Sequence, residues 1–110
     1  MDELPIEIDV NETKALHDEK DCLLLDCRNQ NEYDFVHIDG CTLIPMGELQ
    51  QRITELDSFR EKRIVVYCHI GGRSFQVASW LRKQGFSQTQ SMAGGVEAWA
   101  EQIDPKLPRY

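Results

Sequence analysis

Residues 64–74 read Ile64-Val65-Val66-Tyr67-Cys68-His69-Ile70-Gly71-Gly72-Arg73-Ser74, an apolar run followed by a glycine-containing loop and then a segment of helical periodicity. A buried strand that ends at a cysteine and turns into a helix directs backbone N–H groups and the positive helix end at the sulfur. Such surroundings favour the thiolate, which is the nucleophilic form of cysteine. The stretch therefore predicts a strand–loop–helix unit with Cys68 as a catalytic nucleophile.

The other residues of this loop have expected roles in holding a substrate. Two glycines allow backbone amides to converge without side-chain clashes, and Arg73 supplies a fixed cation. Ser74 is expected to cap the helix and to add a hydroxyl donor. His69 either hydrogen-bonds an acceptor molecule or lines the mouth of the site, and both alternatives stay open. The expected substrate-binding residues are His69, Ile70, Gly71, Gly72, Arg73 and Ser74.

Length and composition predict one compact domain over residues 1–110, because 110 residues with 41% hydrophobic content support a single modest core. No window approaches eighteen consecutive apolar residues, and the amino terminus lacks a signal-peptide pattern. We therefore expect a soluble cytoplasmic protein without membrane contact. The net charge of −7 disfavours nucleic acid, and it makes an anionic substrate dependent on a local cation such as Arg73.

Four cysteines are present, and all are expected to be reduced, because a chain of this length without a signal peptide does not need disulfides. A zinc site formed by Cys22, Cys27, His37 and Cys41 is not expected, since the spacings match no tight zinc knuckle. Cys22 and Cys41 are interpreted as core residues. For Cys27 two interpretations remain, a packed small side chain or a redox or relay partner of Cys68.

Short apolar runs alternate with amphipathic segments along the chain, which is typical of an α/β domain with a doubly wound sheet and right-handed crossovers. Helix caps are predicted at Asp9 and Asn29 and a left-handed helix end at Gly85. Ligands bind beyond the carboxyl ends of the strands in such sheets, which places Cys68 and residues 26–28 at one edge. The predicted strands are 6–9, 22–26, 41–44, 63–67 and 89–92, and the later helices are 49–56, 74–85 and 96–101.

Three segments together resemble the rhodanese (sulfurtransferase) family: Leu25-Asp26-Cys27-Arg28 followed by Glu32-Tyr33 and His37-Ile38-Asp39-Gly40, then Val66-Tyr67-Cys68 with its loop, then Gly94-Gly95-Val96-Glu97-Ala98-Trp99. The resemblance implies a rhodanese-like three-layer sandwich, with a five-stranded mostly parallel sheet and helices on both faces. It also implies ping-pong transfer of sulfane sulfur through a Cys68 persulfide, without metal or cofactor. The implied partners are a small sulfur donor such as thiosulfate, an acceptor such as cyanide or a thiol, or a sulfur-carrier or persulfide protein.

Other functions remain as alternatives at this point. Cysteine phosphatases and arsenate reductases resemble C-x5-R, whereas Cys68 and Arg73 form C-x4-R, a tighter loop that suits one sulfur atom better. A binding or regulatory module of the same fold would present the loop without turnover. Asp26 and Arg28 are expected to support the site by tying together the loops beneath it, with a direct functional role as the alternative.

Overall fold

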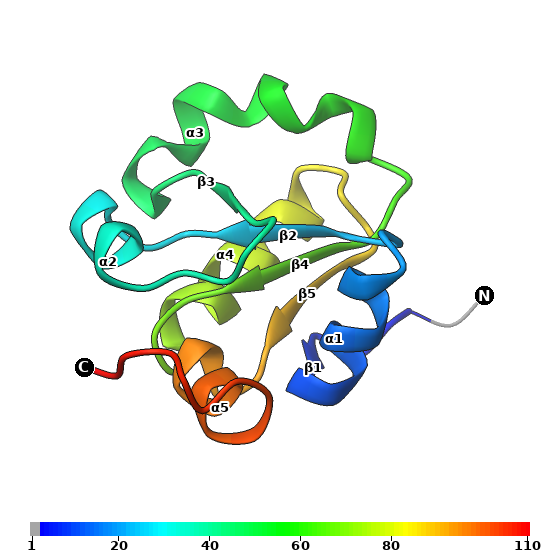
Figure 1. The fold of residues 1–110 in the computed structure, drawn as a ribbon. Coiled ribbons are helices and arrows are strands. Elements are labelled where there is room, and N and C mark those ends of the chain that lie inside the picture. The colour runs from blue at the N-terminus through cyan, green and yellow to red at the C-terminus, as the bar shows by residue number, and fades with distance from the viewer. Residues whose placement is uncertain (1–2) are drawn as a thin grey trace.

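The computed structural model describes residues 3–110, in which five strands form one parallel sheet (Figure 1). The spatial order is β1-β5-β4-β2-β3, so the chain crosses over between neighbouring strands, as parallel pairing requires. The central strands β4 and β2 lie between the shorter edge strands. The strands are β1 (Glu7–Ile8), β2 (Leu23–Asp26), β3 (Thr42–Leu43), β4 (Ile64–Tyr67) and β5 (Thr89–Met92).

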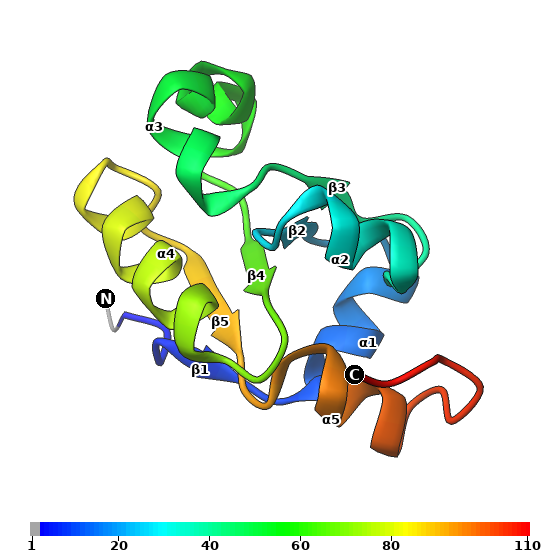
Figure 2. The ribbon, with the colours of Figure 1, turned by 90° about the vertical axis from the view of Figure 1, so that its left-hand side faces the viewer.

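Helices cover both faces of the sheet, which confirms the predicted α/β sandwich (Figure 2). One face packs against α1 (Val10–Asp18) and α5 (Gly95–Gln102). The opposite face packs against α4 (Gly72–Lys83) and the helical segment of residues 46–59. The short helix α2 (Gln30–Phe35) follows β2. Among residues 3–110, no helix has the length and apolar content needed to cross a lipid bilayer.

Successive side chains of β2 and β4 point to opposite faces of the sheet, and so they contribute to the hydrophobic core on each face. Leu24 pairs with Val65 and faces α1 and α5, while Leu25 pairs with Val66 and faces α4. All four of these side chains are buried, as expected for strands covered on both faces. The sheet is therefore rigid at the point where β2 and β4 end, and these ends carry the candidate site.

The predicted helix ends are confirmed at three positions. The Asp9 carboxylate accepts the Glu12 backbone N–H at 2.8 Å and caps α1. Asn29 and Glu32 form a capping box at the start of α2. Gly85 has a φ of +100° after α4, the left-handed conformation that glycine adopts without steric cost.

The segment predicted as one helix over residues 49–56 is instead divided. A 3-10 turn (η1, Met46–Glu48) leads into one α-turn (α3, Leu49–Arg52), and a longer 3-10 helix (η2, Ile53–Phe59) follows. The apolar spacing of four and then three residues suits this change, because 3-10 helices repeat every three residues. Leu49 and Leu56 are still buried against the sheet.

The start of α4 also differs from the prediction. The helix begins at Gly72 and its N-cap is Gly71, so Ser74 lies inside the first turn and is not the cap. A glycine takes the cap position because the backbone there has a φ of +120°, which strains any side chain. The Ser74 side chain is thereby free to point toward Cys68.

Candidate active site

The ends of β2 and β4 bring two sequence segments to the same edge of the sheet. Asp26 pairs with Tyr67 in the ladder, and the Cys27 N–H donates to the Tyr67 carbonyl at 3.2 Å. Cys27 and Cys68 are therefore the residues that directly follow the neighbouring strands β2 and β4. The structure brings together the nucleophile candidate and the supporting residues Asp26 and Arg28, as parallel strands with a common carboxyl edge require.

The Cys68 sulfur lies within a ring of donors supplied by its own loop and the first turn of α4. The N–H groups of Gly71 and Ser74 donate to Sγ at 3.1 and 3.3 Å. The Ser74 hydroxyl lies 3.4 Å from the same atom. The loop thus directs main-chain donors at the sulfur in the way that the glycines and the helix start predicted.

These contacts shift the ionisation of Cys68. Burial is the largest influence and works against the thiolate, but hydrogen bonds from the Ser74 hydroxyl and from backbone amides outweigh it. The pKa of Cys68 is consequently lowered from its ordinary value. A lowered pKa increases the fraction of nucleophilic thiolate near neutral pH.

The Ser74 hydroxyl is fixed by a partner that the sequence did not single out. Its Oγ lies 2.7 Å from Ser91 Oγ on β5 and donates to the Gly71 carbonyl at 3.2 Å. Ser91 is fully buried in an interior strand. The only sequence feature that points to Ser91 is its polar side chain within a strand that is covered on both faces of the sheet.

Gly94 and Gly95 place α5 directly on the backbone of the cysteine loop. The amides of Val96 and Glu97 donate to the carbonyls of Cys68 and His69 at 2.9 and 3.1 Å. A Cβ on Gly95 would lie 2.3 Å from the His69 oxygen, so only glycine permits this contact. The contact orients the peptide groups of the loop so that its N–H groups face the sulfur.

Arg73, which was expected to supply a fixed cation at the loop, is paired with a carboxylate. Its guanidinium donates two hydrogen bonds to the Glu32 carboxylate, at 2.7 and 2.9 Å. This arginine, through the hydrogen bonds it donates, lowers the pKa of Glu32 to about 2. Glu32 belongs to a segment that resembles the rhodanese family, but its pairing with Arg73 is hidden in the sequence because the two residues are 41 positions apart.

Asp26 and Arg28 form a second two-hydrogen-bond pair, and both side chains are entirely buried. Arg28 donates to the two Asp26 carboxylate oxygens at 3.0 and 2.7 Å and to the Val36 carbonyl at 2.6 Å. These bonds satisfy the charges inside the fold. Burial away from the sulfur and this complete set of partners fit the supporting role predicted for the two residues.

Tyr110 joins the two pairs and also contacts the loop. Its hydroxyl accepts from Arg28 at 2.8 Å and donates to Glu32 at 2.6 Å. Its ring stacks on the His69 ring, with centroids 3.9 Å apart. No local sequence pattern indicates this role, since a tyrosine far along the chain reaches the site only through the path of the residues after α5.

The cysteine loop is exposed at its tip and closed around the sulfur. Ile70 is 66% exposed, whereas Cys68 is only 1% exposed. His69 is partly covered by the Tyr110 ring, so it lines the outer part of the loop. A reactant therefore meets the exposed loop tip before it meets the buried sulfur.

The remaining cysteines are all free thiols. Cys27 is buried, and its S–H donates to the Tyr67 carbonyl at 3.5 Å. Burial, with a contribution from the neighbouring Cys68, raises the pKa of Cys27 to about 12, so this thiol stays protonated at neutral pH. Residues 3–110 contain no cluster of three or more histidine, cysteine or acidic side chains that fits a metal ion.

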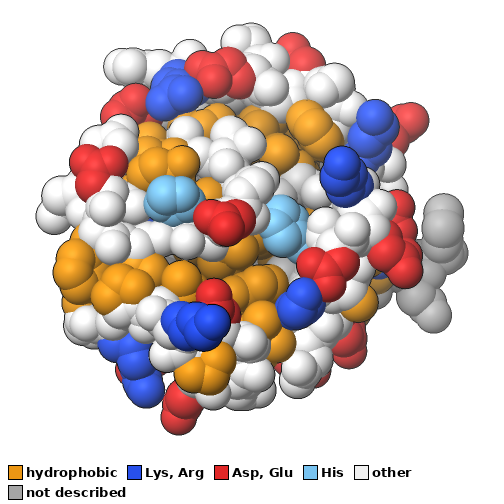
Figure 3. Space-filling model, viewed as in Figure 1, with side chains coloured by type: hydrophobic (Ala, Val, Ile, Leu, Met, Phe, Trp, Pro, Cys, Tyr) orange, Lys and Arg blue, Asp and Glu red, His pale blue; other side chains and the backbone are white. Residues whose placement is uncertain are grey.

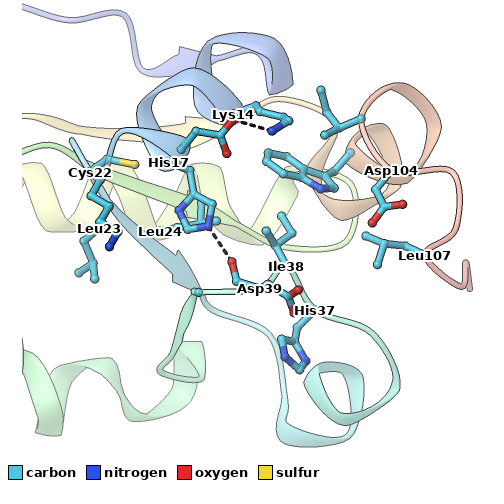
Figure 4. A pocket seen from close by; sticks show the side chains of 15 residues that line it. Lys14, His17, Cys22, Leu23, Leu24, His37, Ile38, Asp39, Asp104 and Leu107 are labelled. Atoms are coloured by element: carbon cyan, nitrogen blue, oxygen red, sulfur yellow. Dashed lines mark hydrogen bonds and ion pairs between the residues drawn. The ribbon is translucent and has the colours of Figure 1, made fainter.

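A separate pocket of about 640 Å³ opens between α1, α5 and the segment before β3 (Figure 4). His17 lies in hydrogen-bond contact with the Asp39 carbonyl at 2.7 Å on one side of it. Leu24 and Trp99 contribute apolar walls. None of the residues 68–74 lines this pocket, so it is not the site formed around Cys68.

Comparison with known proteins gives one family. Residues 9–102 match the Rhodanese-like domain family. The chain is 36% identical to the thiosulfate sulfurtransferase GlpE of Coxiella burnetii, over 73% of each chain. It is also 36% identical to the probable adenylyltransferase/sulfurtransferase MoeZ of Mycobacterium tuberculosis, over 79% of this chain and 22% of that protein.

A solved structure shows the same fold. The crystal structure of a rhodanese-related protein from Thermoplasma volcanium superposes with a TM-score of 0.80, at 26% identity, over 90% of this chain and 94% of that one. Several relatives are much larger proteins. The chain spans 30% of the length of one such relative, a Rhodanese-like/PpiC domain-containing protein of Arabidopsis thaliana.

Proposed function

The chain belongs to the rhodanese-like domain family, and we propose on that premise that it is a sulfurtransferase that carries sulfane sulfur as a persulfide on Cys68. The observation that supports this most directly is the convergence of the Gly71 and Ser74 backbone N–H groups on Sγ, at 3.1 and 3.3 Å. These donors favour the thiolate before transfer. They are also positioned to stabilise the anionic outer sulfur after transfer.

The proposed reaction has two half-reactions with balanced atoms and charge. In the first, the Cys68 thiolate attacks the outer sulfur of thiosulfate or of a persulfide, the donor's S–S bond breaks, and sulfite or a thiolate leaves with the electron pair. In the second, cyanide or a thiolate attacks the outer sulfur of the Cys68 persulfide and regenerates the Cys68 thiolate. The enzyme thus alternates between free and sulfur-loaded forms.

The surface around the loop supports a protein as donor or acceptor. The large hydrophobic side chains that are exposed among residues 3–110 all lie around the cysteine loop and the neighbouring ends of β2, β3 and α2. Part of this apolar surface is visible at the left of Figure 3, where α2 and the C-terminal segment lie. Clustered exposed apolar surface is typical of protein contact sites. The residues are Phe35, Met46, Ile70, Phe75 and Tyr110.

The alternatives have less support. A phosphatase needs the loop arginine for the phosphoryl group, whereas the Arg73 guanidinium is bound by Glu32. A module without turnover needs no activated thiol, whereas the pKa of Cys68 is lowered: burial opposes this, but hydrogen bonds from Ser74 and backbone amides outweigh it.

Mass spectrometry tests the proposal without assuming a physiological donor. Incubation with a sulfane sulfur donor is expected to add one sulfur atom to the protein, and subsequent cyanide is expected to remove it as thiocyanate. Cys68→Ser is expected to abolish loading, while Cys22→Ser, which changes a cysteine remote from the loop, is expected to retain it. If thiosulfate and persulfide donors both leave the mass unchanged, the protein is not a sulfurtransferase.

A further inference from the structure

Both arginines at the site are already bound by carboxylates. Arg28 is held by Asp26 and Arg73 by Glu32, each with two hydrogen bonds. The N–H groups of Gly71 and Ser74 donate to the Cys68 sulfur, the thiol lies against the Ser74 hydroxyl, and no lysine or arginine side chain among residues 3–110 donates to the sulfur. The four charged side chains of these two pairs therefore sum to zero.

Tyr110 holds Glu32 in this arrangement. Its hydroxyl donates to Glu32 Oε2, while Arg73 contacts both carboxylate oxygens. The resulting chain of contacts runs from Asp26 through Arg28, Tyr110 and Glu32 to Arg73. Glu32 is also tied to its own helix start, where one carboxylate oxygen accepts the Asn29 N–H at 3.2 Å. With four hydrogen bonds from three residues, the carboxylate is fixed beside the guanidinium, and the charge of Arg73 stays neutralised.

This arrangement matters because the two donor classes differ in charge. Thiosulfate is a dianion and leaves as the dianion sulfite, so binding it beside a carboxylate in a protein of net charge −7 requires an available cation. A persulfide brings at most one negative charge to the reacting sulfurs and leaves as a thiolate. Pairing of Arg73 with Glu32 therefore weakens the binding of thiosulfate more than the binding of a persulfide.

We propose that Glu32, positioned by Tyr110, is a specificity-determining residue that makes persulfides, rather than thiosulfate, the preferred sulfur donors. This inference rests on the proposed sulfur transfer through Cys68. In the preferred half-reaction the Cys68 thiolate attacks the outer sulfur of R–S–SH, the donor S–S bond breaks, and R–S⁻ leaves with the electron pair. The products are the Cys68 persulfide and one thiolate, and no external oxidant or reductant is needed.

The test compares two donors, thiosulfate and cysteine persulfide, in wild type and Glu32→Gln. The glutamine keeps the side-chain oxygen that accepts the Asn29 N–H, so α2 retains its cap. Removing the carboxylate charge frees Arg73 to attract the dianion. We define the donor ratio as kcat/KM for thiosulfate divided by kcat/KM for cysteine persulfide. We expect this ratio to rise about tenfold, because the variant removes one negative charge that repels the thiosulfate dianion across a distance partly screened by water.

Glu55→Gln is the matched control. Glu55 forms an equivalent pair with Arg52, at 2.8 and 3.1 Å, outside the segments that surround Cys68, and the substitution changes the net charge by the same amount. The donor ratio is expected to stay at the wild-type value in this variant. An equal rise in both variants would assign the effect to net charge and overturn the role of Glu32.

Salt dependence of wild type provides a second measurement that needs no variant. Repulsion of the dianion is screened by salt, so thiosulfate loading is expected to accelerate with ionic strength, and cysteine persulfide loading much less. Thiosulfate loading that slows with salt would show attraction by an available cation and overturn the proposal. If both donors load the protein and Glu32→Gln leaves their ratio unchanged, the specificity inference fails while sulfur transfer stands. If neither donor loads wild type, both fail.

Discussion

The site contains two arginine–carboxylate pairs of nearly the same geometry in different surroundings. In the Asp26–Arg28 pair both side chains are 0% exposed, whereas in the Glu32–Arg73 pair the arginine is 35% and the glutamate 14% exposed. Both pairs make two hydrogen bonds at 2.7–3.0 Å. Burial, and not contact geometry, separates them.

The difference in burial gives the two pairs different roles: the buried pair supports the fold, and the outer pair can be changed without loss of the fold. A charge that loses its partner inside the protein cannot be solvated by water, so the buried pair must remain intact for the fold to form. A charge near the surface is solvated when its partner is removed, so the outer pair is replaceable and its charge balance is available to control which reactant binds. Tyr110 is bonded to both pairs and connects the two roles.

The largest effect is expected from Asp26→Asn, which leaves the Arg28 charge buried without a counter-charge. We expect a loss of about 3–5 kcal/mol in the free energy of unfolding, measured by urea denaturation. The exposed pair of Arg52 and Glu55 supplies the control, since Glu55→Gln removes a charge that water solvates and is expected to leave the free energy of unfolding almost unchanged. Equal losses in the two variants would contradict the distinction between the pairs.

A double substitution sharpens the same point. Asp26→Leu with Arg28→Met removes both charges together, so no uncompensated charge remains buried. We expect this variant to recover roughly half of the stability lost in Asp26→Asn, because apolar pairs often replace buried ion pairs without net cost. Full recovery is not expected, since the buried Val36 carbonyl loses the hydrogen bond from Arg28. A double variant less stable than Asp26→Asn would show that the pair stabilises the fold through its charges.

The link between the pairs is tested by Tyr110→Phe, which removes the hydroxyl and keeps the ring that stacks on His69. We expect a loss of about 1 kcal/mol, the usual contribution of a partly buried hydrogen bond. A double-mutant cycle with Glu32→Gln, read by chemical denaturation, is expected to show coupling between the two residues. Strict additivity would mean that the hydroxyl does not hold Glu32.

The smallest effect on stability is expected from Glu32→Gln, below about 1 kcal/mol at neutral pH. Folding lowers the pKa of Glu32 from 4.5 to about 2, with hydrogen bonds from Arg73 as the main cause. Its contribution is therefore present above pH 4.5 and is lost as the pH falls toward 2. Unfolding curves of wild type and variant are expected to differ slightly at pH 7 and to converge across that acidic range. A difference that grows on acidification would reverse the assigned sign.

Local patterns predicted most of the fold. The runs that form β2, β4 and β5, the caps at Asp9 and Asn29 and the helix end at Gly85 all depend on neighbouring residues. Two local predictions were wrong. Residues 49–56 are divided equally between one α-turn and a 3-10 helix, and Gly71 replaced Ser74 as the helix cap, where the backbone has a positive φ.

The sequence predicted the cysteine loop and the supporting residues Asp26 and Arg28, but not the contacts that reach the loop from distant segments. The order of Cys68, the two glycines and Ser74 indicates amides converging on a thiolate, since these residues are near one another in the chain. Ser91, Gly95 and Tyr110 contact the cysteine loop and Ser74 from distant segments. Each contact depends on how α5, β5 and the residues after α5 pack against the loop, which local periodicity does not specify.

The sequence by itself determined that a cysteine would end a buried strand and lie at the start of a helix, because strand and helix formation depend on short-range patterns of apolar and turn residues. It also determined that an arginine would lie beside that cysteine. Only the tertiary structure decided that this arginine is neutralised by Glu32 and that Glu32 is held by Tyr110. The physical reason is that pairing of charges depends on distance in space and on burial, and both follow from the packing of segments 41 and 78 residues apart.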